Sequence, residues 1–269
     1  MDGETSISAS TVNLSDEQKS LKNGCGLSYD EYNTTYQKML SSIYTNGGFW
    51  ISRYEIGDST ATEKNETRTR ASGTNGTAVS KQNQIPYNYV TCNQAQTLSS
   101  EIANGTNKTG SLLFGIQWDL VCKFLEEKTN LTIEDLKSNS ASWGNYQDTS
   151  LKLNSGKYNI SPWITSSVWN PYNTNTENYV TNSITSNNEN YKQLLTTGAS
   201  EQTNKMNIYD FAGNAWEWTL EHATSVENKN CALRGGVYNN GGAVRPVANR
   251  YSFQTTYNAD NVGFHSTLY

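Results

Sequence analysis

Two acidic residues, Asp210 and Glu217, bracket a short turn in the sequence NIYDFAGNAWEWTLE, residues 207–221. Gly213 is a residue type that suits a tight turn with a left-handed backbone. Such a turn can bring two carboxylates together, and main-chain carbonyls can complete a cage of oxygen atoms, which suits calcium. Asp210, Gly213, Ala215 and Glu217 are therefore candidate ligands of a structural calcium ion. The alternative is that Asp210 caps the turn and Glu217 pairs with a surface cation.

The cysteines offer a second kind of chemistry, and their spacing argues against it. Cys25, Cys92, Cys122 and Cys231 are far apart in the sequence and form no CxxC pair. A zinc site is therefore not expected. Cys122 lies among apolar residues and is expected to be a small core residue. Cys231 is expected to be alone.

The elements that must position these residues show in the hydrophobic spacing. Residues 28–46 predict a helix with Ser28 as its N-cap, followed by Gly47, and carry an apolar stripe of Tyr29, Tyr32, Tyr36, Met39, Leu40 and Ile43. Residues 48–57, GFWISRYEIG, predict a strand. Residues 58–84 are polar and predict an exposed excursion.

The rest of the chain alternates clear patterns with irregular ones. A short helix is expected after Thr91, and a second helix is expected to bury a stripe of Ile116, Leu120, Val121, Phe124 and Leu125. Residues 128–205 predict a long, nearly structureless tract, which is usually functional or wraps the domain. Trp216 and Trp218 alternate as on a strand, with both rings on one side. Val262, Phe264 and Leu268 predict a final strand.

Composition limits the possible classes of protein. The chain has 269 residues, of which 35% are hydrophobic, 17% charged and 11% aromatic. These values predict one compact domain with many polar loops, over residues 28–269, after a linker or N-terminal extension at 1–27. The net charge of -5 argues against nucleic acid as a partner. No apolar run reaches the roughly 20 residues of a membrane helix, so membrane insertion is not expected.

The motif GNAWEW, followed by RGG at Arg234–Gly236 and by a terminal GF at Gly263–Phe264, resembles the formylglycine-generating enzyme (sulfatase-modifying factor) family. The resemblance spans roughly residues 48–269 and implies an α+β, C-type lectin-like fold with long irregular insertions. It also implies calcium at the turn described above. Where the family usually reads GFR, this sequence has His265, which we expect to act as a weaker, pH-dependent donor.

The same resemblance argues against catalysis. The family's enzyme oxidises a substrate cysteine through a cysteine pair placed shortly after RGG, which would bind copper as soft thiolate ligands. Residues 237–269 contain no cysteine. We therefore expect no copper and no enzymatic activity.

In place of that active site, residues 237–261 mix many residue types with no period of 2 or 3.6. A free-form segment between fixed anchors resembles the hypervariable region of diversity-generating retroelement variable proteins, which occur in bacteria and their phages. In those proteins, error-prone copying at template adenines rewrites asparagine codons. The expected ligand-binding, variable positions are Val237, Asn239, Asn240, Gly241, Val244, Arg245, Tyr251, Ser252, Phe253, Tyr257, Ala259 and Asp260.

Such a surface would recognise a ligand. Tyr251, Phe253 and Tyr257 offer large contact areas at low entropic cost, and Arg245 and Asp260 add charge. The expected partner is a surface protein or glycan of a host or neighbouring cell. The expected location is a virion surface (phage tail or capsid) or a bacterial cell surface, where display in many copies would add avidity. Two alternatives stay open: a divergent formylglycine-generating-type oxidoreductase, and a structural virion protein that binds no ligand.

Overall fold

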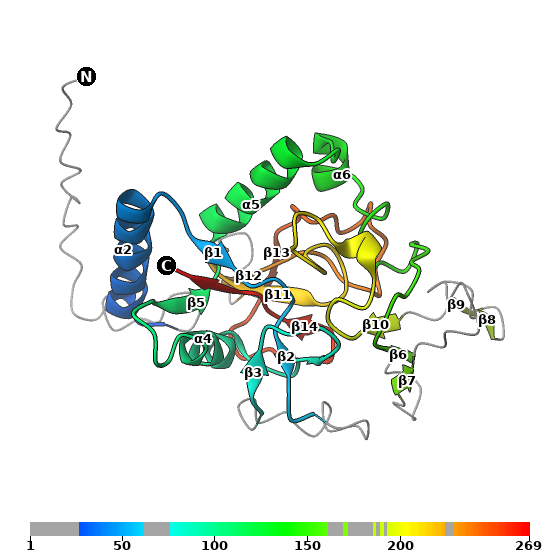
Figure 1. Cartoon of the computed structure of the whole chain (residues 1–269), viewed down its shortest axis with the longest axis horizontal. Helices are drawn as coiled ribbons and strands as arrows, with labels where there is room; N and C mark the ends of the chain where they lie inside the picture. The colour runs from blue at the N-terminus through cyan, green and yellow to red at the C-terminus, as the bar shows by residue number, and fades with distance from the viewer. Residues whose placement is uncertain are drawn as a thin grey trace.

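The computed structural model describes residues 27–61, 76–160, 169–171, 185–186, 189–190, 193–223 and 229–269 (Figure 1). The predicted extension at 1–27 therefore lies outside the described residues except for Leu27, as does the middle of the predicted excursion at 58–84. Within the described part of the chain, no helix has the length and apolar character needed to cross a membrane.

Helix α2 (Tyr29–Asn46) confirms the first predicted helix. The Ser28 hydroxyl accepts a hydrogen bond from the Glu31 N–H, and the Glu31 carboxylate accepts one from the Ser28 N–H, which together form a capping box. Gly47 ends the helix with a φ of 78°, as expected of a glycine that follows a helix. Met39 is fully buried and fixes the inner face of α2 against the core.

Helix α5 (Gly115–Lys128) forms where expected, but the prediction of its buried stripe is partly wrong. Its buried side chains include Trp118, Cys122 and Leu125, together with Val121. Ile116, Leu120 and Phe124 are 50%, 47% and 39% exposed, so three of the five residues of the predicted stripe face outward. The helix is apolar on two faces, and spacing alone does not say which face meets the core.

A further helix and a three-stranded sheet lie beside these helices. Helix α4 (Cys92–Glu101) begins at the predicted cap, Thr91. Strand β5 (Gly110–Leu112) and strand β1 (Trp50–Ile51) flank β15 (Ser266–Leu268) in a three-stranded sheet. The predicted strand at 48–57 is therefore much shorter than expected.

The chain leaves β1 and enters a second small sheet. There β2 (Gly57–Asp58) pairs with β3 (Ala78–Val79) and with β4 (Ile85–Pro86). The long strand predicted from residue patterns is thus divided between two sheets.

A four-stranded sheet lies at the centre of the molecule (Figure 1). Its order is β13 (Tyr251–Phe253), β12 (Cys231–Arg234), β11 (Trp216–His222) and β14 (Val262–Gly263). The last pair, β11 and β14, is parallel. Trp218 on β11 is fully buried, and its indole N–H donates to the Val90 carbonyl at 2.8 Å.

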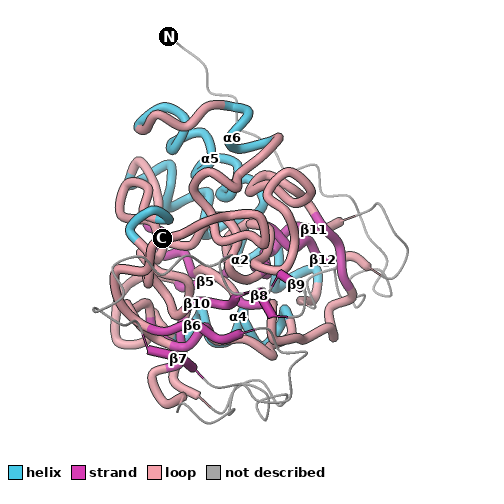
Figure 2. Tube along the Cα trace, turned by 90° about the vertical axis from the view of Figure 1, so that its right-hand side faces the viewer, coloured by secondary structure: helices cyan, strands magenta, loops and turns pink. Residues whose placement is uncertain are grey.

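The tract at 128–205 contains more structure than its composition predicted. Helix α6 (Ile133–Lys137) packs beside α5. Further along lie β6 (Lys157–Ile160), β7 (Trp169–Pro171), β8 (Thr185–Ser186), β9 (Glu189–Asn190), β10 (Gln193–Leu195) and the 3₁₀ turn η1 (Glu201–Thr203). Figure 2 shows that loops still dominate this side of the molecule, with β6, β7 and β10 low and α5 and α6 high.

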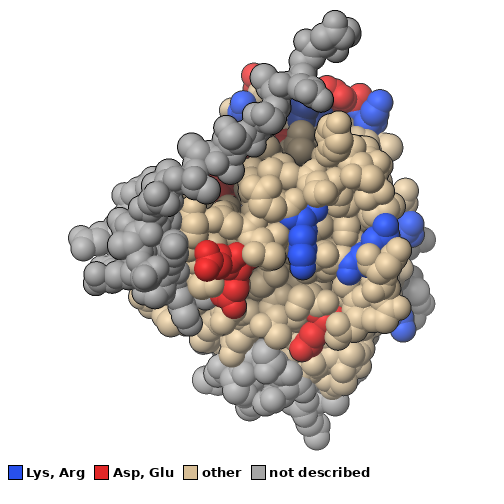
Figure 3. All heavy atoms as spheres, turned by 90° about the vertical axis from the view of Figure 1, so that its left-hand side faces the viewer, with Lys and Arg blue, Asp and Glu red and all other residues tan. Residues whose placement is uncertain are grey.

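The overall arrangement is α+β, as predicted, with helices around several small sheets. One hydrophobic cluster joins α2, α4 and the central sheet, and another lies beneath α5. On the face shown in Figure 3, basic and acidic side chains form small separate groups within a mainly uncharged surface.

Candidate ligand-binding surface

Residues 237–261 begin and end on the central sheet. The segment leaves β12 through Gly235 and Gly236, whose φ angles are 90° and 81°. It returns as β13 beside β12 and then continues to β14, which pairs with β11. Both ends of the irregular segment are therefore fixed to neighbouring strands of one sheet.

The main chain of the segment is tied to the rest of the protein at several points. The Asn240 carbonyl accepts from Gln147 N–H at 3.0 Å, and the Gly242 N–H donates to an Asp148 carboxylate oxygen at 2.9 Å. Near the end of the segment, the Ala259 carbonyl accepts from Tyr89 N–H at 3.0 Å. On the segment's side these contacts use main-chain atoms, so they survive a change of side chain.

Three of the predicted ligand-binding residues form a row of aromatic rings in contact. Tyr251 and Phe253 meet edge to face with ring centroids 5.3 Å apart, and Phe253 stacks on Tyr257 at 3.9 Å. At the start of the row, Tyr251 stacks on Trp216 at 5.5 Å. Tyr251, Phe253 and Tyr257 are half-buried, whereas Trp216 is buried beneath them. Stacked pairs of this kind restrict ring motion and leave one edge or face accessible.

Two cations flank this aromatic row. The Arg245 guanidinium lies 4.3 Å from the centroid of the Tyr251 ring, and the Lys229 ammonium lies 5.6 Å from that of Phe253. Arg245 was predicted from the sequence, whereas Lys229 was missed because it precedes β12, outside the irregular segment. No pattern in the sequence identified Lys229, or placed Trp216 under Tyr251.

The other predicted positions differ in how deeply they are buried. Val237 is fully buried in the core, so its side chain cannot meet a ligand in this structure, and the prediction for this residue needs correction. Gly241 is also buried, beside Asp148. Val244 is 62% exposed. The half-buried positions are Asn239, Asn240, Ser252, Ala259 and Asp260.

Asp260 already makes hydrogen bonds to other residues of the protein. Its carboxylate accepts a hydrogen bond from the buried Tyr238 hydroxyl at 2.9 Å, and its carbonyl accepts from the Asn88 amide at 2.7 Å. The surface that the structure brings together is therefore the aromatic row with its two cations. The turn at 239–241 and Asp260 are attached to the frame separately.

Beneath the segment, Arg234 forms buried ion pairs. Its side chain is fully buried and pairs with Asp119 of α5 and with Glu221. It also donates to the Ala248 carbonyl at 2.9 Å, within the irregular segment. Arg250 pairs with the same two acids from the surface. This network ties β12, β11, α5 and the segment to one another.

The turn predicted to bind calcium is buried. The two Asp210 oxygens accept from the Gly198 N–H at 2.6 Å and the Thr203 hydroxyl at 2.8 Å. Glu217 accepts from the His265 N–H at 3.0 Å, and its other oxygen lies 2.8 Å from His265 Nδ1. His265 Nε2 is 3.1 Å from the Tyr209 carbonyl. The partner of Glu217 is thus a buried histidine.

A third acid, Glu55, lies in this interior and was not singled out in the sequence. Its carboxylate accepts from the Asn214 amide at 2.6 Å. Burial raises the pKa of Glu55 well above its usual 4.5, and the charges of Glu217 and Asp210 raise it further. Burial also raises the pKa of Asp210 and that of Glu217, although His265 partly offsets the latter. The one signal in the sequence that could have identified Glu55 is its position as an acid within the predicted strand GFWISRYEIG, which is rich in aromatic residues.

These contacts fit a calcium ion poorly. Each Asp210 oxygen and each Glu217 oxygen is already directed at a protein donor or at His265. A cation here would have to replace those contacts, because oxygen ligands must turn their lone pairs toward the metal. Calcium at Asp210, Gly213, Ala215 and Glu217 stays a prediction that none of these contacts favours.

Cys231 is not alone, which corrects the sequence prediction. Its Sγ lies 3.0 Å from Sγ of Cys92, the first residue of α4. Both side chains are fully buried, and Cys122 is buried elsewhere, on the inner face of α5. A separation of 139 residues along the chain gave no hint of this pair.

Comparison with known proteins adds the family. The model described as Sulfatase-modifying factor enzyme 1-like domain matches residues 25–266. No curated protein matches the sequence.

Three solved structures are similar at low identity. "Crystal Structure of CarF" shares 12% identity over 81% of this chain and 85% of that chain, with a TM-score of 0.47. PvdO from Pseudomonas aeruginosa shares 14% over 82% and 80%, with a TM-score of 0.42. Treponema denticola variable protein 1 shares 13% over 60% of this chain and 48% of its own, with a TM-score of 0.31. At these TM-scores the structural similarities carry no further argument.

Proposed function

The chain belongs to the sulfatase-modifying factor enzyme 1-like domain family, whose fold is C-type lectin-like, and we propose that it binds a ligand through residues 237–261. The observation that carries this proposal is the half-buried row of Tyr251, Phe253 and Tyr257, flanked by Arg245 and Lys229. Aromatic side chains of this type anchor many recognition surfaces.

The rigidity of the surface supports recognition. Because frame residues hold the main chain of the segment, binding does not have to order a loose loop, and less conformational entropy is lost. Stacking on Trp216 holds the first ring of the row in place. The result is a preformed surface whose side chains can change while its main-chain path stays the same.

This separation between frame and side chains supports the further proposal that the segment is diversified. In a retroelement variable protein, each new sequence must still fold. Main-chain contacts at Asn240, Gly242 and Ala259 do not depend on which side chain is present. Buried anchors such as Arg234 and Phe264 lie outside the diversified residues and can remain constant.

The proposed partner is a surface protein or glycan of a host or neighbouring cell. We place the protein on a phage virion or a bacterial cell surface. There, many copies would raise weak single-site binding through avidity. These proposals of partner and location follow from the chemistry of the surface and from its resemblance to retroelement variable proteins.

A divergent oxidoreductase is the competing function. The thiols closest to one another among the described residues, Cys92 and Cys231, are fully buried, and a peptide substrate could not reach them without opening the core. The segment after Gly236 contains no cysteine to act in their place. Copper-dependent oxygen consumption with a cysteine-containing peptide would favour the enzyme over the binding protein.

The proposed surface can be tested with labelled protein on a panel of bacterial cells. A triple variant, Tyr251→Ala with Phe253→Ala and Tyr257→Ala, should lose at least about tenfold in apparent affinity for any cell that the wild type binds. The matched control is Tyr44→Ala on α2, which removes a ring that is 93% exposed and far from the segment in sequence. If the triple variant binds as the wild type does, residues 237–261 are not the binding surface.

A further inference from the structure

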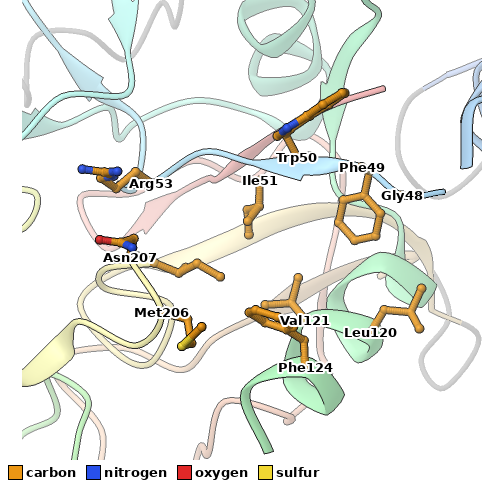
Figure 4. Close-up of a pocket in the computed structure, with 11 residues that line it drawn as sticks. Gly48, Phe49, Trp50, Ile51, Arg53, Leu120, Val121, Phe124, Met206 and Asn207 are labelled. Atoms are coloured by element: carbon orange, nitrogen blue, oxygen red, sulfur yellow. The ribbon is translucent and has the colours of Figure 1, made fainter. Parts of the chain in front are cut away.

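A second surface, made of different residues, lies between β1, α5 and the loop at 206–208. A pocket of about 450 Å³ opens there. Figure 4 shows Phe49, just before β1, and Ile51 on β1 directed toward Val121 and Phe124 on α5, with Met206 beside them.

Several apolar side chains that line this pocket are unusually exposed to solvent. Leu120 and Met206 are each 47% exposed, and Phe124 is 39% exposed. These are the side chains of α5 that the sequence pattern expected in the core, together with one from the neighbouring loop. A contiguous group of exposed apolar side chains is typical of an interaction site.

The strand beside the pocket has an open edge. The Ser52 N–H donates to the Ser266 carbonyl at 2.8 Å, so Ser52 faces β15. In an antiparallel pair, neighbouring residues alternate between facing the partner strand and facing away. The N–H and C=O of Ile51 therefore point to the outer edge of β1, where no described strand pairs with it.

The chain itself already uses this edge once. The Arg53 carbonyl accepts a hydrogen bond from the Tyr209 N–H at 2.8 Å, just after the loop that lines the pocket. An incoming segment could extend that pairing along Ile51 and Phe49. Each such main-chain bond would satisfy a group that otherwise depends on water.

One end of the pocket is positively charged. Arg53 lies at that end, beside Asn207 (Figure 4). Its side chain is exposed, and no described acidic residue forms an ion pair with it. The other lining side chains are mainly apolar. An anionic group on an otherwise apolar ligand would complement this charge.

We propose that this pocket binds an extended, apolar peptide segment that carries a carboxylate. The peptide main chain would pair with the open edge at Phe49 and Ile51, and alternate apolar side chains would enter the space beside Leu120, Phe124 and Met206. Its carboxylate would lie at Arg53. This is recognition by strand addition, in which main-chain bonds hold the peptide and pockets select its side chains. An apolar small molecule would leave the strand edge unused.

The inference does not depend on the proposed function of residues 237–261, because it uses none of them. A displayed library of random eight-residue peptides provides a test with the folded protein. Selection against the wild type should enrich peptides with alternating apolar residues and an Asp or Glu near one end. The same selection against Arg53→Glu should replace the acidic preference by Lys or Arg, since the charge of the pocket end is reversed.

Two variants identify where selected peptides bind. Leu120→Asp, at an exposed position, should lower their affinity at least about tenfold, because it places a charge in the apolar pocket. Its melting temperature and circular dichroism establish that it folds. Tyr251→Ala, on the surface at 237–261, should leave their affinity unchanged. A synthetic copy of a selected peptide, methylated on alternate main-chain nitrogens, should bind weakly if the peptide pairs with the strand edge.

The opposite results overturn the proposal. If selection against the wild type enriches no peptide relative to the same selection against Leu120→Asp, a peptide site in this pocket is excluded. Peptides whose affinity falls with Tyr251→Ala but not with Leu120→Asp would belong to the surface at 237–261. Unchanged binding of the methylated peptide would exclude strand addition.

Discussion

At the scale of single residues, the frame is marked by acidic side chains buried in its interior. Glu217 contacts His265 at 2.8 Å, and Glu55 contacts the Asn214 amide at 2.6 Å. Residue types alone could suggest that Asp210 and Glu217 approach each other. Residue types could not reveal that the carboxylate oxygens of Asp210 and Glu217 accept hydrogen bonds from other segments. The donors belong to Gly198, Thr203 and His265, which the fold brings to these two acids.

Glu55 makes stability depend on pH in a defined direction. Its pKa in the folded protein lies above the usual 4.5, so folding favours the protonated form. Its contribution to stability is fully present below the unfolded pKa and is lost as pH rises through the raised folded pKa. Glu55→Gln should therefore be more stable than the wild type at pH 8, by about 1–3 kcal/mol, the usual cost of a poorly compensated buried group.

Urea unfolding of both proteins between pH 5 and pH 8, in buffer with a chelator, measures this difference. The gain in unfolding free energy from Glu55→Gln should grow with pH. A gain that is constant across the range, or a loss of stability at pH 8, would show that the Glu55 carboxylate is well compensated in the fold.

Gly236 is the residue at which the frame passes into the irregular segment. Its φ is 81°, and a Cβ there would lie 2.2 Å from the Arg245 carbonyl oxygen. Gly236→Ala should cost at least about 2 kcal/mol of unfolding free energy, since it adds a main-chain clash to backbone strain. Gly47→Ala is the matched control: its φ is 78° with nothing within 4 Å, so it should cost only about 1–2 kcal/mol.

Thermal or denaturant unfolding of the two alanine variants separates strain from crowding. Equal losses in the two variants would mean that the segment can move away from Gly236. The main chain of residues 237–261 would then be less firmly held than its hydrogen bonds indicate.

At the scale of elements, local chemistry made some features predictable. Ser28 and Thr91 mark the starts of their helices and Gly47 marks the end of α2, as their residue types indicate. These positions were predictable because helix caps are local interactions. The buried face of α5 was not predictable. Ile116, Leu120 and Phe124 are as apolar as the buried residues, and only the position of β1 and the loop at 206–208 leaves them exposed.

Strands were less predictable than helices. The pattern at 48–57 indicated one strand, but β1 and β2 belong to different sheets because their partners, β15 and β4, are distant in sequence. The tract at 128–205 looked structureless for a similar reason. Its strand β10 is fixed by the Asn214 side chain, which accepts from the Leu195 N–H at 3.0 Å. Pairing of this kind is set by tertiary contacts.

The Cys92–Cys231 contact joins two elements, α4 and β12. With Sγ atoms 3.0 Å apart, the two thiols should form a disulfide when treated with diamide, which takes up the two hydrogens released. The free thiols counted in denaturant should fall from the four of the sequence to two. A cross-link between residues this far apart should stabilise the fold by about 2–4 kcal/mol.

Peptide mapping by mass spectrometry identifies the pair that forms. Cys122→Ser should still form the disulfide, because Cys122 lies in a different cluster beneath α5. Prolonged oxidation that leaves all thiols free, or that joins Cys122 to either partner, would contradict the geometry of this contact.

At the scale of the whole molecule, we propose that the protein combines a fixed frame with a replaceable surface. The frame consists of the central sheet, the buried network around Arg234 and the acids near His265. The surface consists of the aromatic row and its cations, on a segment held mainly through its main chain. The family and the location of the segment were predictable from RGG, GNAWEW and the terminal GF, since these motifs are frame residues.

Which residues of the segment reach the surface was only partly predictable. A segment without hydrophobic periodicity does not indicate which side chains face the core and which face solvent. Val237 and Val244 therefore look equivalent in the sequence, although Val237 is fully buried and Val244 is 62% exposed. Lys229 was missed because the segment was defined by its lack of pattern. Three-dimensional contact with Phe253 is what brings it to the surface.

The most direct test of the central claim is to sequence the 3′ end of this gene, with the adjoining DNA, across a natural population. We expect changes concentrated at surface positions such as Val244, Tyr251, Phe253 and Tyr257, with Val237 remaining apolar and Gly236 constant. We expect those changes to match adenines in a near-copy repeat beside a reverse transcriptase gene. An invariant segment without such a repeat, or changes spread equally over the buried frame, would contradict a diversified binding surface.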